Sequence, residues 1–547
     1  MYEDEQYNEF TTLCRQIASK DEIEAICIYG SRVGGYARKD SDYDVLLILT
    51  RFKNGVRYFY RTIEDKQYAI LTVDKKAIEM DVETGNFGDF IAGRLISPYK
   101  PILNPEYLED LEVKVKKRFA EEELQDLVIE YEELARGLVI KPEYFILARM
   151  KKRSRGYPPL RYSYMQMLKD ELRVQNLEAI LGGYRSALKQ LQNEHIIHYF
   201  NDEITVVNSY VDNVLSSKML NRVVNFIDSS RRALSSYITH GRAGRVKLDV
   251  FAKELTSKLK RELKVAFAGE DIEDPKNYLF LLTEQGLVNL NEQNRMLESI
   301  QEFLDNQATK SQPLSNALND VFLVTVNNEK YVVKKFTNWY NVKWFVLNIA
   351  AYGTKIFALS GKARLANEYG INRLLAENKM HVPDIVTISL KDRMLVQRFI
   401  PGINGLEFYG KAFASPGLTD KQKQIAQTIG NTIAEIHALN VAIGDCKPEN
   451  FVITDNEGVF VLDLEQGERN GDKAWDIAEF LYFSGHFGSH YTGGMKDFVK
   501  CFIKGYCTQG KKSVLRKASN FRYSRVFLGW TSTPIIKSIA ATLKSVR

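Results

Sequence analysis

The chain has 547 residues, of which 45% are hydrophobic and 26% are charged. At about 100 to 200 residues per domain this length predicts several domains, and the composition excludes a disordered, collagen-like or disulfide-stapled protein. The net charge of +6 is unevenly spread: residues 1–140 carry 19 Lys and Arg against 28 Asp and Glu, and residues 141–547 carry 56 against 41. The basic part is therefore the candidate surface for nucleic acid or another polyanion.

The cysteines and the first residues bear on the cellular compartment. The five cysteines include no C-x-x-C pair, which argues against a disulfide framework and against a thiolate zinc site. The chain starts with acidic residues where a signal peptide would be basic, and no apolar run reaches the ~20 residues of a membrane span. We therefore expect a reduced, cytoplasmic protein that does not associate with membranes.

Residues 1–105 are predicted to form one small α/β domain. A helical segment is followed by the apolar strand Ile23–Tyr29, a turn rich in Gly and Ser, and the strand Val45–Leu49. Residues 106–145 are expected to form a helical connector, because apolar side chains recur at helical spacing from Glu121 to Leu134.

The middle of the chain is predicted to be helical and basic. Residues 146–215 contain a helical pattern followed by two short strands around Asn201 and Asp202, which is compatible with a winged helix. Residues 216–310 are mostly helical in pattern, and residues 231–264 within them hold ten Lys and Arg against three acids. These basic residues favour contact with RNA.

The segment SQPLSN at 311–316 predicts a domain boundary. Residues 311–547 then alternate strands, helices and turns in the manner of a two-lobed α/β domain. Residues 511–547 contain nine Lys and Arg and no Asp or Glu, which predicts a basic C-terminal tail that binds RNA. The expected fold class is therefore multidomain, with α/β domains at both ends and a helical middle.

The first candidate site lies in the segment ICIYGSRVGGYARKDSDYDVLLIL. Gly30 and Ser31 follow one predicted strand, and Asp42 and Asp44 stand at the entry to the next. Side chains two apart on a strand point the same way, and two close carboxylates favour a divalent cation such as Mg²⁺ bridging nucleotide phosphates. Gly30 would let the backbone approach a triphosphate, and Ser31 offers a hydroxyl and an amide.

A second metal ion would need a third carboxylate, which would also orient an attacking hydroxyl. Asp74, at the end of the apolar segment Ala69–Val73, is the first candidate, and Asp81 is the alternative. The G-S and D-x-D pattern resembles the nucleotidyltransferase superfamily of DNA polymerase beta, especially its minimal and CCA-adding members. The resemblance implies a nucleotidyltransferase fold over residues 1–105 and a nucleoside triphosphate with Mg²⁺ as substrate and cofactor. A degenerate domain kept for nucleotide binding is the alternative.

The second candidate site lies in the segment IGDCKPENFVITDNEGVFVLDLEQ. Phosphoryl transfer needs a carboxylate to accept the hydroxyl proton and oxygen ligands to hold Mg²⁺. On that logic Asp445 is the catalytic base, Asn450 and Asp463 hold the metal, and Lys447 lies toward the γ-phosphate of ATP.

Two further residues upstream complete this constellation. Lys334 ends the strand-like segment VVKKF, and Glu368 lies in the helix-like segment ARLANEYGINRLLAENK, where an ion-pair partner of Lys334 is expected. The set resembles the protein-kinase-like superfamily, and within it the RIO-like atypical kinases, including the small archaeal kinase of the KEOPS complex. The resemblance implies a two-lobed fold over residues 311–547 that binds ATP and Mg²⁺.

The same resemblance implies three supporting roles. Asp476 would brace the catalytic loop from a following helix, and the adenine would lie against a linker from Gln397 to Ile400. No glycine-rich loop precedes Lys334, so the phosphate clamp is expected to be built from Ser315 and backbone. The segment DLEQ replaces the usual D-F-G, which argues against regulation by activation-loop phosphorylation.

Relatives of both families act on tRNA or beside tRNA enzymes, so the two resemblances favour RNA such as tRNA as the substrate. We therefore expect an ATP-dependent phosphotransferase fused to a nucleotidyltransferase. The alternatives are an atypical Ser/Thr protein kinase, and a nucleotide-binding regulator or toxin–antitoxin-like module with one inactive site. A protein partner is compatible with each. The acceptor atom, the preferred nucleotide and the oligomeric state stay open.

Overall fold

The computed structural model divides the chain into two compact units. Unit 1 comprises residues 1–130 and 138–279, and unit 2 comprises residues 131–137 and 280–547. The parts that the structure describes are residues 2–63, 66–157, 159–217, 231, 232, 235, 236, 239, 243, 271–291, 312–315, 320–326, 328–338, 357–456, 458–488 and 490–546. Most of the predicted basic helical region at 216–310 therefore lies outside the described residues. Among the described helices none is long and apolar enough to cross a membrane.

A five-stranded sheet forms the N-terminal part of unit 1. Its strands lie in the order β3-β4-β2-β1-β5, and β2 and β4 run parallel whereas the other neighbours are antiparallel. The bounds are β1 (Ile23–Tyr29), β2 (Tyr43–Leu49), β3 (Val56–Ile63), β4 (Lys66–Asp74) and β5 (Lys100–Leu103). The predicted strands at 23–29 and 45–49 are thus confirmed.

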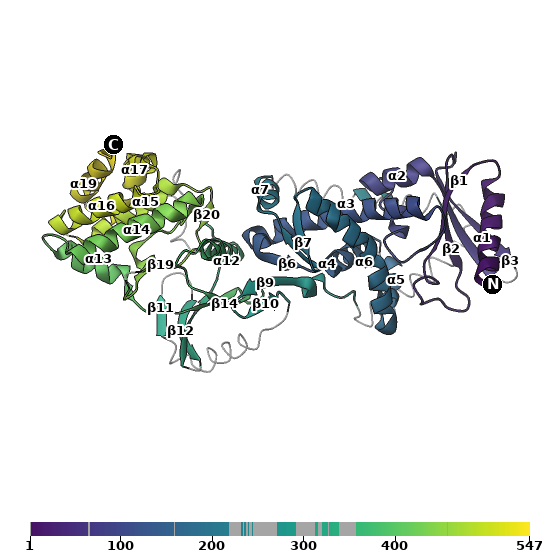
Figure 1. The fold of residues 1–547 in the computed structure, drawn as a ribbon, viewed down its shortest axis with the longest axis horizontal. Helices are drawn as coiled ribbons and strands as arrows, with labels where there is room; N and C mark the ends of the chain where they lie inside the picture. The colour runs from purple at the N-terminus through teal and green to yellow at the C-terminus, as the bar shows by residue number, and fades with distance from the viewer. Residues whose placement is uncertain are drawn as a thin grey trace. The chain divides into compact units, whose positions relative to one another are not determined.

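Helices cover both faces of this sheet, which explains why its central strands are apolar throughout. Helix α1 (Tyr2–Ala18) packs on one face, and α2 (Lys75–Thr84) and α3 (Pro105–Tyr131) pack on the other (Figure 1). Leu108, Leu111 and Val115 of α3 are buried in the core on that face. The first half of α3 therefore belongs to the α/β domain and is not a connector, as residues 106–145 were expected to be.

The remainder of unit 1 is mainly helical. The predicted strand hairpin is present, and Asn201 and Asp202 turn it with φ values of 50° and 55°. Ile204 of the hairpin pairs with Ile140, so a third strand joins it. The winged helix itself stays a prediction. The elements are β6 (Leu138–Ile140), α4 (Glu143–Gly156), α5 (Pro159–Met167), α6 (Asp170–Asn193), β7 (Ile197–Phe200), β8 (Glu203–Val206), α7 (Asn208–Ser216) and a short 3-10 turn, η3 (Pro275–Tyr278).

The first half of unit 2 contains an antiparallel five-stranded sheet in the order β11-β12-β13-β15-β14. Residues 312–315 form its edge strand β11, so the segment predicted as a domain boundary is part of a sheet. The elements are β9 (Leu279–Thr283), β10 (Gly286–Asn289), β11 (Gln312–Ser315), β12 (Asp320–Val326), β13 (Glu329–Lys335), α12 (Gly361–Glu377), β14 (Ile385–Ser389) and β15 (Met394–Arg398).

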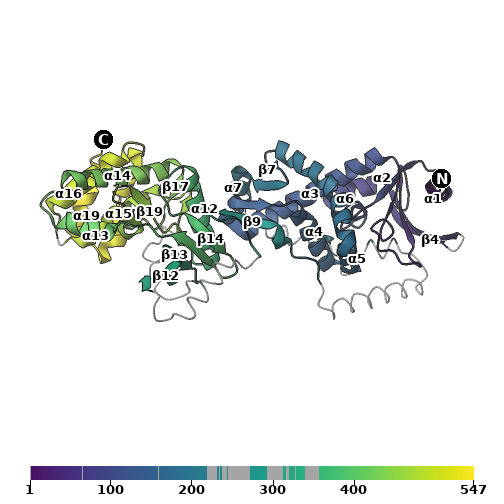
Figure 2. The same ribbon diagram turned by 60° about the horizontal axis from the view of Figure 1, so that its bottom comes forward.

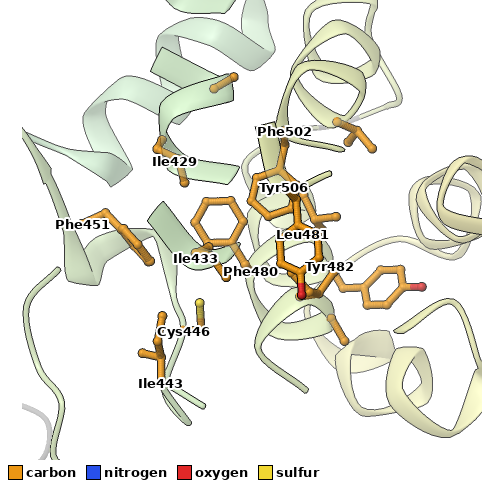
Figure 3. Packing of buried hydrophobic residues seen from close by; sticks show 14 of the residues in the cluster. Ile429, Ile433, Ile443, Cys446, Phe451, Phe480, Leu481, Tyr482, Phe502 and Tyr506 are labelled. Carbon is orange, nitrogen blue, oxygen red and sulfur yellow. The ribbon is translucent and has the colours of Figure 1, made fainter. Parts of the chain in front are cut away.

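The second half of unit 2 is mostly helical, and its helices gather apart from the strands β12 to β14 (Figure 2). Ile433, Phe480, Phe502 and Tyr506 pack together in its core (Figure 3). The elements are β16 (Ile403–Asn404), α13 (Gly405–Ala414), α14 (Asp420–Ala438), β17 (Val441–Ala442), η4 (Pro448–Asn450), β18 (Phe451–Ile453), β19 (Val459–Val461), β20 (Glu468–Arg469), α15 (Lys473–Ser484), η5 (Gly485–Phe487), α16 (Gly493–Tyr506), α17 (Lys512–Ala518), α18 (Phe521–Ser524), η6 (Arg525–Gly529) and α19 (Thr533–Lys544).

The basic segment 511–546 is not a tail. It forms α17, α18, η6 and α19, and these helices bury apolar side chains in the core of unit 2. The buried residues are Leu515, Ala518, Tyr523, Phe527, Ile535, Ile536, Ile539 and Leu543. The prediction of a basic tail is therefore wrong, because the sequence alternates basic residues with apolar residues at helical spacing.

Candidate active sites

In unit 1 the turn after β1 lies directly against Asp44. Tyr29, the last residue of β1, pairs with Asp44 of β2. Gly30 follows with a φ of 82°, and a Cβ atom there would come within 2.3 Å of Asp44 Oδ2. Only glycine fits this position. The Cβ atom of any other residue would clash with the carboxylate, and its backbone would be strained in the left-handed conformation. The structure thus brings Gly30 and Asp44 together, with Asp42 two residues before Asp44 and partly exposed like it. The predicted roles of these residues in binding phosphate and metal stay predictions.

The same turn is tightly folded. The Gly34 amide donates to the Gly30 carbonyl, and the Tyr36 amide donates to the Ser31 carbonyl, both at 3.0 Å. Asn176 of α6 is buried, and its side-chain amide donates to Gly34 O at 3.0 Å and to Met167 O at 2.8 Å. Ser31 is partly exposed at the start of the turn. The sequence did not indicate Asn176, because it lies more than a hundred residues from the turn that it holds.

Asp74 does not join Asp42 and Asp44. In the parallel register of β2 and β4 it pairs with Leu49, whereas Asp44 pairs with Ala69. Five residues of strand separate the two levels, which is about 16 Å at ~3.3 Å per residue. Asp74 instead caps α2 by accepting from the Lys76 amide at 3.0 Å, and it accepts from the Phe52 amide at 2.8 Å. This placement contradicts the prediction that Asp74 supplies the third carboxylate.

Asp81, the alternative, also has another task. It is buried in α2 and accepts backbone N–H groups from Phe87, Asp89, Ile91 and Ala92 at 2.8 to 3.2 Å. Its two oxygens thereby fix the loop that follows α2. Burial, with the charge of Asp89, raises the pKa of Asp81. Within the described residues no cluster of three or more His, Cys, Asp and Glu side chains has metal-binding geometry.

In unit 2 three predicted residues form one ion-pair cluster, in which Lys334 and Glu368 are buried and Asp463 is partly exposed. Lys334 Nζ on β13 lies 2.8 Å from Glu368 Oε1 on α12 and 3.3 Å from Asp463 Oδ1. Burial alone would lower the pKa of Lys334, but Asp463 and Glu368 raise it above its usual value, so the ammonium stays charged. The structure therefore brings together residues from three segments that are far apart in the sequence.

Glu368 also makes contacts that position it. It accepts from the Leu464 amide at 2.5 Å and from Gln397 Nε2 at 3.0 Å. Gln397 lies within β15, pairs with Val332 and is buried. Its place is thus in a strand and not in a linker, and its side chain is engaged by Glu368, while the predicted contact of Gln397 with the adenine stays a prediction.

The loop before β18 holds the remaining predicted residues. Lys447 Nζ lies 2.7 Å from Asp445 Oδ1, and the Asn450 side-chain amide donates to the Asp445 carbonyl at 2.8 Å. The Leu462 amide donates to the Asn450 carbonyl at 2.7 Å, which places Asp463 one residue from that contact. Asp463 has a φ of 52°, in the left-handed region that few residues other than glycine adopt. Burial would lower the pKa of Lys447, but Asp445 and Glu479 raise it.

Helix α15 supports this loop from one side. Asp476 accepts from the Ile443 amide at 2.6 Å, from the Gly444 amide at 2.8 Å, and lies 2.9 Å from His437 Nε2. The implied bracing role of Asp476 thus agrees with its contacts. Glu479, which the sequence did not indicate, lies one turn further along α15 and accepts from the Cys446 amide at 2.7 Å.

Ser315, the predicted phosphate clamp, is the last residue of β11, and its backbone pairs with Val321. Its side chain and residues 316–319 lie outside the described part of the chain. The clamp therefore stays a prediction. The donor set that is described, with two carboxylates and one amide beside a lysine, suits a nucleotide with Mg²⁺.

The N-terminal part of the chain is similar to a known family. Residues 12–85 match the family of polymerase beta nucleotidyltransferases, and they include Gly30, Ser31, Asp42 and Asp44. No curated protein matches the chain. Unit 1 thus carries a nucleotidyltransferase domain, as its turn and carboxylates indicated. The match says nothing of unit 2.

Proposed function

We propose that unit 2 transfers the γ-phosphate of ATP to an acceptor hydroxyl, as RIO-like atypical kinases do. The observation that supports this most is the contact of Lys334 with both Glu368 and Asp463, beside a loop that carries Asp445 and Asn450. A lysine, two carboxylates and the loop of a third carboxylate and an amide thus come together from separate segments. Phosphoryl transfer requires such a set.

Each of these residues has a defined part in the proposed reaction. Lys334 holds the α- and β-phosphates, while Asp463 and the amide oxygen of Asn450 ligate Mg²⁺. Asp445 orients the acceptor hydroxyl and takes its proton as the new O–P bond forms. The bond between the γ-phosphorus and the β-γ bridging oxygen breaks, and ADP leaves. Lys447, 2.7 Å from Asp445, neutralises charge that develops on the transferred group.

Unit 1 is proposed to bind a nucleoside triphosphate with Mg²⁺ and to transfer its nucleoside monophosphate to an acceptor hydroxyl. The acceptor oxygen bonds to the α-phosphorus as its proton passes to solvent, the bond from the α-phosphorus to the α-β bridging oxygen breaks, and pyrophosphate leaves. Gly30 and Ser31 would hold the phosphates, and Asp42 and Asp44 would ligate the metal. Support comes from the contact of Gly30 with Asp44 and from the family match. Among the described residues no third carboxylate joins Asp42 and Asp44, which favours the alternative of a domain that binds without turnover.

The acceptor that we propose is RNA. Phe521, Arg522, Arg525, Leu528 and Trp530 are exposed on unit 2, and we call them the basic-aromatic face. Tyr523 and Phe527 lie on the buried side of the same helical stretch, so Phe521, Arg522, Arg525 and Leu528 share the other side, and the exposed Trp530 directly follows this stretch. Exposed aromatic rings stack on unpaired bases, and cations bind the backbone phosphates.

The test is incubation with γ-labelled and α-labelled ATP plus total RNA, for wild type and for Asp445→Asn and Asp463→Asn. Asp455→Asn, an exposed acid of unit 2, is the matched control. Each site variant should lower the rate of γ-label transfer by a factor of ~10² or more, because the base or a metal ligand is absent while the fold is kept. Full transfer by Asp463→Asn would contradict the metal assignment.

The destination of the label distinguishes the alternatives. The γ-label on RNA supports the proposal, whereas the γ-label on protein alone favours an atypical protein kinase. If neither label reaches RNA or protein, the nucleotide-binding regulator is the better description.

A further inference from the structure

The sheet face that carries Asp44 lacks an acid where the third carboxylate would stand. Ala69 of β4 lies level with Asp44, and Tyr60 of β3 pairs with Ala69. Leu46 and Leu71, the next residues on this face, are buried in the core. The position beside Asp44 on the neighbouring strand is therefore occupied by a methyl group, which cannot hold a metal ion.

Arg94 lies across this same face. Its Nη2 donates to the Tyr58 hydroxyl at 3.1 Å, and its guanidinium carbon is 5.1 Å from the ring centre of Tyr29. Tyr58 is on β3 and Tyr29 is on β1, so β4 and β2 lie between them. The guanidinium therefore spans the strands that carry Ala69 and Asp44.

The fold holds Arg94 in this place. It ends the short turn η1 (Ala92–Arg94), whose loop is fixed by the four amides that donate to Asp81. Arg153 donates to Asp89 O at 2.9 Å from outside the loop. Burial would lower the pKa of Arg94, but Tyr58, Tyr29 and Asp44 raise it, so the guanidinium stays charged. A cation is thus built into the site beside its carboxylates.

Arg94 Nε is buried and has no hydrogen-bond partner within the described part of unit 1. The Tyr29 hydroxyl beside it is also buried, and Tyr58 is the side chain that interacts with it. Tyr29 is only 5% exposed, so solvent reaches it poorly. Buried donors without a partner are costly and are often satisfied by a ligand, and anionic oxygen is the best acceptor for a guanidinium.

We propose that Arg94 and Tyr29 form the phosphate-binding half of the unit 1 site, which binds a nucleoside triphosphate with a single Mg²⁺ on Asp42 and Asp44. This rests on the proposed nucleotide binding of unit 1. Asp42 and Asp44 can ligate one divalent cation, and Ala69, level with Asp44 on the neighbouring strand, offers no ligand for a second. Arg94 supplies the charge compensation that a second metal ion gives in a two-metal site.

The experiment uses the full chain and the photoreactive probe 8-azido-ATP, with the labelled peptides assigned to unit 1 or unit 2. Arg94→Met should lower labelling of unit 1 at least tenfold, Tyr29→Phe should lower it several-fold, and Arg94→Lys should restore part of it. Arg57→Met, an exposed arginine of the same sheet, should label like wild type. Labelling of unit 2 should stay unchanged in all four variants.

A metal count completes the test. In an Asp463→Asn, Asn450→Ala background, which removes both proposed metal ligands of unit 2, Mn²⁺ titration with ATP should give one bound ion in unit 1. Two bound ions, or wild-type labelling of Arg94→Met, would overturn the inference. Absence of unit 1 labelling in the wild type would overturn both the inference and the proposed nucleotide site, whereas loss of unit 2 labelling concerns the kinase proposal alone.

Discussion

Glu479 is a buried carboxyl group beneath the loop of Asp445. It accepts from the Cys446 amide at 2.7 Å and from Trp475 Nε1 at 3.1 Å, and it is 4% exposed. Burial, and then the charge of Asp445, raises the pKa of Glu479 well above its usual value. The native state therefore holds this proton more tightly than the unfolded state does, and ionisation of Glu479 destabilises the fold.

Replacement of Glu479 by Gln tests this sign. Stability from the protonated group is complete below the ordinary carboxyl pKa of about 4.3 and is lost as pH rises through the raised pKa. Glu479→Gln mimics the protonated form and keeps an acceptor for the Cys446 amide, so unit 2 should melt at a higher temperature than wild type on the alkaline side. Thermal unfolding across pH measures this. Glu377→Gln, at an exposed position of α12, is the control and should keep the pH dependence of wild type. Equal pH dependence of the melting temperature in wild type and Glu479→Gln would contradict the prediction.

Individual residues show how far the sequence predicts a site. Gly30 and Asp44 were predictable because a turn and the next strand of an antiparallel pair are neighbours in space. Asp74 was misassigned because the register of β4, which the sequence does not fix, places it five residues beyond Asp44. Arg94 was not predictable, since a basic residue in a loop carries no pattern until the sheet beneath it is known.

At the scale of elements, the strands were predicted better than the domain core in which each helical segment packs. Apolar runs such as 23–29 and 45–49 are long enough to specify buried strands, whereas the roles of α3 and of residues 511–546 depend on tertiary packing. Because α17, α18 and α19 belong to the core, deleting 511–547 would unfold unit 2 and could not report on RNA binding. Substitutions on the exposed side are the informative change.

The basic-aromatic face is expected to bind single-stranded RNA through both stacking and charge. Phe521→Ala with Trp530→Ala should weaken binding by ~1–3 kcal/mol per stacked base while leaving the salt dependence unchanged. Arg522→Gln with Arg525→Gln should also flatten the dependence of log K on log salt by about 0.7 per lost phosphate contact. Anisotropy of a labelled oligonucleotide at several salt concentrations measures both effects.

The control for this face is Phe200→Ala, because Phe200 is 77% exposed on β7 of unit 1 and outside the face. It should bind like wild type. Salt-independent binding that is identical in all variants would remove the support for an RNA acceptor and favour a protein substrate.

At the scale of the whole molecule, the chain carries two candidate nucleotide sites built on different principles. Unit 1 places Asp44 on β2 and Asp42 just before this strand, next to a glycine turn. Unit 2 assembles its site from a strand, a helix and two loops. The carboxylates of one unit are not needed to build the site of the other, since the residues named for the first site all lie in unit 1 and those named for the second all lie in unit 2.

The two sites should therefore respond independently to substitution. Asp42→Ala with Asp44→Ala should abolish Mg²⁺-dependent nucleotide binding in unit 1 and any α-label transfer, because the metal ligands are gone, while γ-label transfer by unit 2 stays at the wild-type rate. Asp463→Asn should abolish γ-label transfer and leave nucleotide binding and α-label transfer by unit 1 at the wild-type level. The combined variant should show both losses, as expected for sites that share no partner. The measurement is parallel α- and γ-label transfer by the four full-length proteins. A change of more than a few-fold in γ-label transfer by the Asp42 and Asp44 variant would instead mean that nucleotide binding in unit 1 controls unit 2, which is the behaviour of a regulator.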